Sequence, residues 1–280
     1  MIKSILVALD GSEHAQAASA YALWLAEHLQ ATALGLHVVD VVSIEGSGAF
    51  LHDVSGSLGF EPYLDFSSKM RDALHERGRM VLDQFLAACG ERGVRGDIQL
   101  TTGIVANQIC EYARTADLVV VGHRGVNEQF STGLLGGTTE SVTRKCPKPL
   151  LVTPIGFRPI TRPLLAYDGS QRAAAAMHEA AELAAALALP LTVLHVAKDE
   201  SAATRVLDEV RRYLASYRLD ASYVTRPGYA NEAILETMDA GNHDLLLIGA
   251  YGHSRIIEMV LGSTTEYVLR NSSAPVFLCR

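Results

Sequence analysis

The chain has 280 residues, enough for two domains and a substantial buried core. It is 49% hydrophobic and 20% charged, a composition typical of ordered globular proteins. Its net charge of −7 argues against a surface that binds nucleic acid or an anionic membrane.

The chain begins with MIKSILVALDGS, which predicts a strand at once and leaves no room for a signal peptide. The most hydrophobic long segment, residues 180–196, contains Glu182, Pro190 and His195. It therefore predicts a helix followed by a strand rather than a membrane span. Four cysteines occur without a CxxC pair, which is typical of reduced core residues in a cytosolic protein. We expect a cytoplasmic protein with no membrane segment and no nucleic-acid partner.

Short apolar runs alternate with longer helical patterns. In the first half, the runs that predict strands are residues 5–9, 33–39, 118–121 and 149–152. After the first run, Ser12 is placed as the N-cap of a helix, as is Ser170 in the second half. The apolar face of the first helix recurs at helical spacing through Ala18, Ala22, Leu25 and Leu29.

The second half of the chain repeats the first. Residues 5–12, ILVALDGS, return as PLLAYDGS 158 positions later, and the second strand returns at the same offset. Residues 117–122 return 127 positions later, and residues 136–140 return 126 positions later. The first copy is therefore longer by about 31 residues between its second and third matched strands.

The repeat predicts a first domain over residues 1–154 and a second over residues 163–280, with a Pro- and Gly-containing linker at 153–162. The extra length of the first copy is assigned to residues 43–66, which have loop chemistry. Continuous apolar strands separated by helices indicate a parallel sheet covered on both faces. The predicted fold is α/β, two tandem doubly wound parallel-sheet sandwiches of Rossmann-like type, with ligands beyond the carboxyl ends of the strands.

A glycine-containing loop, GAYGHSRIIEMVLGSTTE, follows the fourth strand of the second copy. Gly252 allows a tight turn, and Gly262, Ser263 and Thr264 open a helix. The free N–H groups and hydroxyls of that helix start attract phosphate. An N-capped helix after a loop explains the same residues without a ligand, and the residues alone favour this interpretation.

Asp168 ends the first strand of the second copy and faces the same edge of the predicted sheet. Its carboxylate suits the hydroxyl or amine end of a nucleotide. An Asx turn at the Asp-Gly corner is the alternative, and the residues alone favour it. The duplicate, Asp10, fits either interpretation.

With these features the chain resembles the universal stress protein family in its tandem form, over nearly its whole length. The second copy has the spacing of that family's ATP-binding signature, G-x2-G-x9-G-S. The resemblance implies that the strand-two valine contacts adenine, that the aspartate lies near the adenosine end, and that the glycine loop and its hydroxyls hold the phosphates. In the second copy these positions are Val196, Asp168, Gly249, Gly252, Gly262, Ser263 and Thr264.

The first copy departs from this signature. Gly122 and Gly125 are present, but ten residues precede Gly136 where nine are expected. Gly137 stands where the second copy has Ser263, which removes a hydroxyl, although Thr138 could substitute as a donor. We therefore rank the second site above the first, whose candidate residues are Asp10, Val38, Gly122, Gly125, Gly136 and Thr138.

The resemblance implies ATP, with or without magnesium, as the bound nucleotide, and a stress-response or signalling role. The sequence has no Walker lysine, no HExxH and no histidine spacing for a metal, so we expect no metal site and no dedicated catalytic residue. Any hydrolysis should be slow. A nucleotide-independent assembly module and a slow nucleotide hydrolase remain alternatives. His37 and His195 are expected to be structural, each with a backbone partner.

In the family, the last strands, here residues 149–152 and 275–278, pair across dimers. The two copies of this chain can form that pair internally. Association of two such chains would give a homodimer with four domains.

Overall fold

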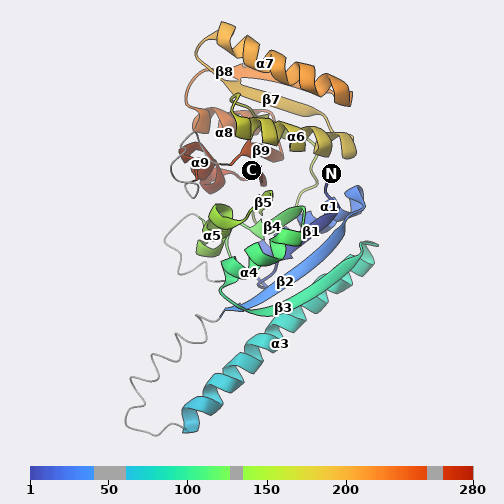
Figure 1. Ribbon diagram of the computed structural model, residues 1–280, viewed down its shortest axis with the longest axis vertical. Helices are drawn as coiled ribbons and strands as arrows, with labels where there is room; N and C mark the ends of the chain where they lie inside the picture. Colours follow the sequence, from blue (N-terminus) through green and yellow to red (C-terminus); the bar gives the residue numbers. More distant parts are fainter. Residues whose placement is uncertain (41–60, 127–134, 251–260, 280) are drawn as a thin grey trace.

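The computed structural model describes residues 1–40, 61–126, 135–250 and 261–279 (Figure 1). The first half contains β1 (Ser4–Ala8), α1 (Glu13–Leu29), β2 (Thr32–Asp40), α3 (Glu61–Glu91), β3 (Gly96–Gly103), α4 (Val105–Tyr112), β4 (Leu118–Gly122), α5 (Gly137–Lys145) and β5 (Leu150–Thr153). The second half contains β6 (Pro163–Ala166), α6 (Gln171–Ala186), β7 (Leu191–Val196), α7 (Glu200–Leu214), β8 (Ala221–Arg226), α8 (Ala230–Ala240), β9 (Leu245–Gly249), α9 (Ser263–Asn271) and β10 (Val276–Cys279).

The strands of the described residues form one sheet, in the order β3-β2-β1-β4-β5-β10-β9-β6-β7-β8. Neighbouring strands within each half are parallel, as the continuous apolar runs predict. The strand order reverses at β1, between β2 and β4, and again at β6, between β7 and β9. The predicted doubly wound α/β fold is confirmed, and each reversal opens a crevice at the carboxyl ends of the strands.

An antiparallel pair joins the two halves. β5 lies beside β10 in a register that places Leu151 opposite Phe277 and Val152 opposite Val276. The predicted pairing of the last strands within one chain is therefore confirmed. Because β5 and β10 run in opposite directions, the carboxyl ends of the two halves lie at opposite ends of this seam.

Helices cover both faces of the sheet, and each face has one apolar core that continues across the seam. α1, α3, α6 and α7 pack on one face, and α4, α5, α8 and α9 pack on the other. The predicted apolar stripe of α1 is buried throughout. The hydroxyls of Ser12 and Ser170 accept hydrogen bonds from Ala15 N–H and Ala173 N–H, both at 3.1 Å, which confirms the two N-caps.

The helix α3 is much longer than its counterpart α7, with 31 residues against 15, and it extends past the end of β3 (Figure 1). Residues 43–60 of the segment predicted as a loop lie outside the described residues. Residues 61–66 are helical, so the loop prediction was wrong there. Pro62 is the second residue of the helix, where its missing N–H removes no intrahelical hydrogen bond. Part of the extra length of the first copy is additional helix.

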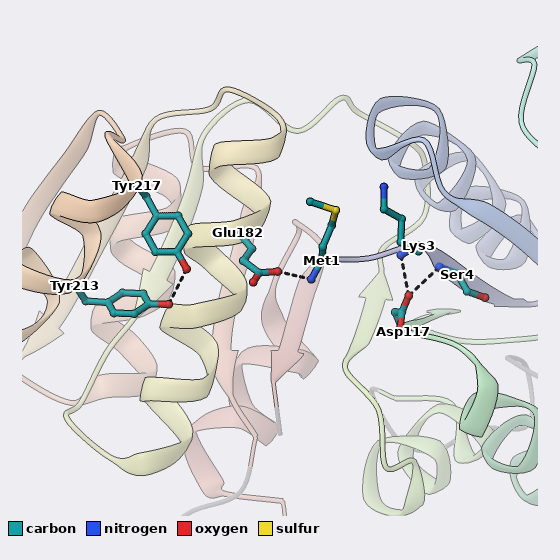
Figure 2. A network of polar contacts seen from close by, with 7 residues as sticks. All are labelled: Met1, Lys3, Ser4, Asp117, Glu182, Tyr213 and Tyr217. Carbon is teal, nitrogen blue, oxygen red and sulfur yellow. Dashed lines mark hydrogen bonds and ion pairs between the residues drawn. The ribbon is translucent and has the colours of Figure 1, made fainter.

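In both halves, an aspartate just before the fourth strand accepts hydrogen bonds from backbone N–H groups at the start of the first strand. The Asp117 carboxylate, just before β4, accepts hydrogen bonds from Lys3 N–H at 2.8 Å and Ser4 N–H at 3.0 Å (Figure 2). Nearby, the Met1 ammonium group pairs with Glu182 of α6 in the other half (Figure 2). The start of the chain therefore contacts both halves.

Asp244 takes the same position before β9 and holds the linker. Its carboxylate accepts hydrogen bonds from Thr161 N–H at 2.8 Å, the Thr161 hydroxyl at 2.6 Å and Arg162 N–H at 2.7 Å. Phe157 of the linker packs edge-on against Tyr21 of α1, with ring centroids 4.9 Å apart. The linker therefore contacts the first half through Phe157 and the second half through Thr161 and Arg162.

We expect Asp244→Ala to lower the free energy of unfolding by about 2 kcal/mol, because hydrogen bonds to a charged acceptor are stronger than average. Urea denaturation followed by circular dichroism measures the change. Asp239→Ala removes an exposed carboxylate at the end of α8 and serves as the control, with little expected change. Equal midpoints for the two variants would show that the linker contact contributes no stability.

Candidate functional site

Each half presents an aspartate at the carboxyl end of its first strand. Asp10 Oδ1 accepts a hydrogen bond from Ser12 N–H, and Asp168 Oδ1 accepts one from Ser170 N–H, both at 2.9 Å. The intervening glycines have φ of +82° and +80°, values that favour glycine. The Asx turn is therefore present in both copies, and each carboxylate is held at the crevice.

In the first half, the same carboxylate also reaches the glycine loop. Asp10 Oδ2 accepts a hydrogen bond from Val126 N–H at 2.9 Å. A Cβ atom at Gly125 would collide with this oxygen. Gly125 therefore allows the loop to close on Asp10, and both oxygens of Asp10 have backbone partners.

The first glycine of each loop lets a helix approach the sheet. A Cβ atom at Gly122 would lie 2.8 Å from the backbone carbon of His14 in α1. A Cβ atom at Gly249 would lie 2.7 Å from the backbone carbon of Arg172 in α6. Both distances are shorter than real contacts allow, so these two glycines have a packing function whether or not a ligand binds.

The helices α5 and α9 begin at the same crevices, and no side chain caps the N–H groups of their first turns. Their N-cap residues, Gly136 and Gly262, provide no side-chain cap. The buried hydroxyl of Thr139 donates a hydrogen bond to the Gly122 carbonyl oxygen at 2.8 Å, which fixes α5 against the end of β4. An uncapped helix start of this kind can bind a phosphate group.

In the first half these parts surround a cavity of about 330 Å³, within the range of about 300–1,000 Å³ that small-molecule sites occupy. All six residues predicted for this site line it: Asp10, Val38, Gly122, Gly125, Gly136 and Thr138. The structure therefore brings together, around one space, residues that are up to 128 positions apart in the sequence.

In the second half, the corresponding cavity is about 150 Å³. It is lined by five of the seven predicted residues: Asp168, Val196, Gly249, Gly262 and Thr264. Ser263, the first residue of α9, is exposed and does not line it. Gly252 lies outside the described residues, as do residues 251 and 253–260 of the same loop.

Two equivalent histidines support the crevices from β2 and β7. His37 Nδ1–H donates to the Leu9 carbonyl oxygen, and His195 Nδ1–H donates to the Tyr167 carbonyl oxygen, both at 2.7 Å. Their predicted structural role is confirmed. Burial lowers the pKa of His37, and the charges of Arg77 and His75 lower it further. The imidazole of His37 is therefore neutral at pH 7.

The structure also brings residues to these sites that the sequence patterns did not indicate. Leu74 and Arg77 of α3 line the first cavity, because the long helix packs on β2 and β3 and passes close to Gly11 after β1. In the second half, the Tyr167 hydroxyl donates to Glu209 of α7 at 3.1 Å. Burial and this hydrogen bond raise the pKa of Tyr167 to about 12. No local sequence pattern indicates which residues of α3 or α7 face these cavities.

The first glycine loop also contacts the second half directly. His123, between Gly122 and Arg124, donates a hydrogen bond from Nε2 to the Leu269 carbonyl oxygen at 2.6 Å. Leu269 lies in the last turn of α9, whose first turn lies at the second cavity. Ala250 occupies the position of His123 in the second copy, and its methyl side chain cannot form a reciprocal hydrogen bond.

Among the helices of the described residues, none is long and apolar enough to span a membrane. No cluster of three or more His, Cys, Asp or Glu side chains within the described ranges could hold a metal ion.

The family model of the universal stress protein family matches residues 1–154 and again residues 160–280. This chain belongs to the universal stress protein family. A family member from Synechocystis sp. is 32% identical over 291 residues, which cover 100% of both chains. One from Methanocaldococcus jannaschii is 29% identical over 54% of this chain and 82% of its own. The matches confirm the tandem form that the internal repeat predicts.

Solved structures of the family share the fold. A universal stress protein from Archaeoglobus fulgidus superimposes with a TM-score of 0.75 over 99% of this chain and 98% of its own, at 22% sequence identity. Another member of the family, solved in complex with cAMP, is 25% identical, covers 43% of this chain and 96% of its own, and has a TM-score of 0.39.

Proposed function

We propose that this tandem universal stress protein binds ATP, chiefly in its second half, in a stress-response or signalling role with at most slow hydrolysis. The observation that carries the proposal is the convergence of three parts at each strand-order reversal. An aspartate, the end of the second strand and an uncapped helix start surround one cavity in both halves.

These parts suit the two ends of a nucleotide. A carboxylate near the switch point can accept hydrogen bonds from ribose hydroxyls, and the uncapped N–H groups of α5 or α9 can bind phosphate oxygens. Gly136 and Gly262 leave room beside those N–H groups because they carry no side chain. Magnesium, if it takes part, would arrive bound to the phosphates, where it would neutralise their charge.

The preference for the second half rests on the loop sequence. There the spacing of the glycines matches the ATP-binding signature, and Ser263 and Thr264 follow with two hydroxyls. In the first half, the longer loop and Gly137 change both features. The larger described cavity of the first half argues in the opposite direction. We give the loop chemistry more weight, because residues 251–260 of the second loop lie outside the described residues.

Isothermal titration calorimetry with ATP and magnesium tests the proposal on the whole chain. We expect saturable binding that weakens about tenfold in Ser263→Gly, which copies the first site. The exposed Ser263 lies between Gly262 and Thr264, which line the cavity, so its hydroxyl would bind a phosphate that extends beyond the cavity, and this hydrogen bond would be lost. Gly137→Ser adds that hydroxyl to the first site, where a Cβ atom meets nothing within 4 Å. It should strengthen binding there by a similar factor. Absence of binding at millimolar ATP in the wild type would refute the proposal.

A nucleotide-independent assembly module is the second candidate function. The packing of Gly122 and Gly249 against helix backbones favours it, because these signature glycines are needed by the fold itself. Under this function, ATP would leave the melting temperature of the wild type unchanged. A shift in the wild type that is reduced in Ser263→Gly would reject it. Association of two chains into a homodimer belongs to either proposal, and sedimentation equilibrium measures it.

A further inference from the structure

The two cavities differ in charge at the end where Asp10 and Asp168 lie. Arg77 of α3 lines the first cavity, and its Nη2 atom would lie 3.9 Å from a Cβ atom at Gly11, next to Asp10. The charge of Arg77 acts on residues of this cavity, because it contributes to the lowered pKa of His37, which also lines it. Across residues 1–40, 61–126, 135–250 and 261–279, no carboxylate forms an ion pair with Arg77.

The second half has no arginine at this position. The stretch Val81-Leu82-Asp83 of α3 matches Val206-Leu207-Asp208 of α7. The structure supports this alignment, because Val81 lies over Gly11 and Val206 lies over Gly169. Arg77 then corresponds to Ala202, only two residues after the start of α7. Both helices therefore have this position, and only the first half carries an arginine there.

Two aspartates line the first cavity: Asp40 at the end of β2, and Asp10 beside Gly11. The Oδ1 atom of Asp10 accepts from Ser12 N–H and its Oδ2 atom accepts from Val126 N–H, so each oxygen already has a backbone donor. In dinucleotide-binding sheets, an acidic residue some distance after the glycine turn binds a ribose hydroxyl, whereas a nearby arginine accommodates a phosphate group on the ribose. Beside Gly11, the first cavity has a carboxylate with a backbone donor on each oxygen and an arginine that forms no ion pair with the described residues, and this arginine is what suits a ribose phosphate.

We propose that the first cavity binds an adenine nucleotide that carries an additional phosphate on its ribose, and that Arg77 determines this specificity. The proposal rests on the proposed function, because it takes adenine nucleotides as the ligand class. The guanidinium group would donate to the ribose phosphate, while the uncapped start of α5, which lines the same cavity, would bind the 5′-phosphate.

The test compares AMP with adenosine 2′,5′-bisphosphate and adenosine 3′,5′-bisphosphate by isothermal titration calorimetry on the whole chain. In the wild type, we expect at least one bisphosphate to bind about tenfold more tightly than AMP, the factor for one added charge-assisted hydrogen bond at an exposed side chain. Arg77→Ala should abolish this difference. Arg79→Ala is the matched control, since Arg79 lies on the same helix, exposed, beside Glu76, and should preserve the difference.

Two results would overturn the inference while leaving the proposed function intact. One is ATP binding by a wild type that holds neither bisphosphate more tightly than AMP. The other is a bisphosphate preference that survives in Arg77→Ala. If no adenine nucleotide binds to the wild type at all, both proposals fail. Circular dichroism spectra of the two variants show whether α3 remains folded.

Discussion

Replacing Gly249 by alanine is expected to lower the free energy of unfolding by about 3 kcal/mol, because a Cβ atom there meets backbone that cannot move cheaply. Its nearest neighbours would be Arg172 C at 2.7 Å, Arg172 O at 2.8 Å and Ala173 N at 2.9 Å, all in the first turn of α6. To relieve the collision, α6 would have to move away from β9, which it covers with a buried apolar face. The loss should appear without any nucleotide.

Urea denaturation of the unliganded protein measures this effect. Gly122→Ala meets the same collision with His14 in the other half and should behave alike. Gly137→Ala is the control, because nothing lies within 4 Å of its Cβ position, and its stability should match the wild type or exceed it. A Gly249→Ala protein with wild-type stability would show that α6 can shift freely. Loss of ATP binding in Gly249→Ala would therefore not identify a phosphate contact.

Gly78→Ala should lower the free energy of unfolding by about 2 kcal/mol, the opposite of the usual effect of alanine in a helix. Gly78 lies inside α3, and its Cβ position is 2.6 Å from His37 Cδ2 and 2.8 Å from Leu100 Cδ1. The helix therefore lies directly on the imidazole that supports the first cavity. A methyl group here would push α3, and Arg77 with it, away from the sheet.

Gly90→Ala in the same helix provides the matched comparison. Its Cβ position has nothing within 4 Å, so alanine should raise the stability by about 0.5 kcal/mol through helix propensity alone. Thermal or urea denaturation of the two variants should give shifts of opposite sign. Shifts of the same sign would mean that the contact between Gly78 and His37 relaxes without cost.

The architecture could be predicted from the sequence because it depends on local patterns that occur twice. The apolar runs indicate parallel strands, and the buried stripe of α1 follows helical spacing. The serine N-caps and the Asx turns depend on side chains within three residues of their partners. The β5–β10 pair was expected from the resemblance to the universal stress protein family, because a chain with two copies can form within itself the strand pair that joins dimers of that family.

The features that the sequence did not indicate depend on contacts between distant elements. Arg77 reaches the first cavity because α3 packs on β2 and β3, with the helix held close to the sheet at Gly78. The helical start of α3 at Glu61 was missed because the residues before it favour a loop. The hydrogen bond between His123 and Leu269 joins residues 146 positions apart and depends on the register of β5 and β10.

The antiparallel pairing of β5 and β10 affects how binding at one crevice could be signalled to a partner molecule. Since the two crevices open at opposite ends of the seam, no single small molecule can bridge them. Under the proposed function, each crevice is either filled or empty, so the chain would have four states of occupancy rather than two. A macromolecule that bound at one end of the sheet would then respond to one ligand only. The exception would be a signal carried by α9, because its first turn lies at one crevice and its last turn accepts a hydrogen bond from His123 of the other half.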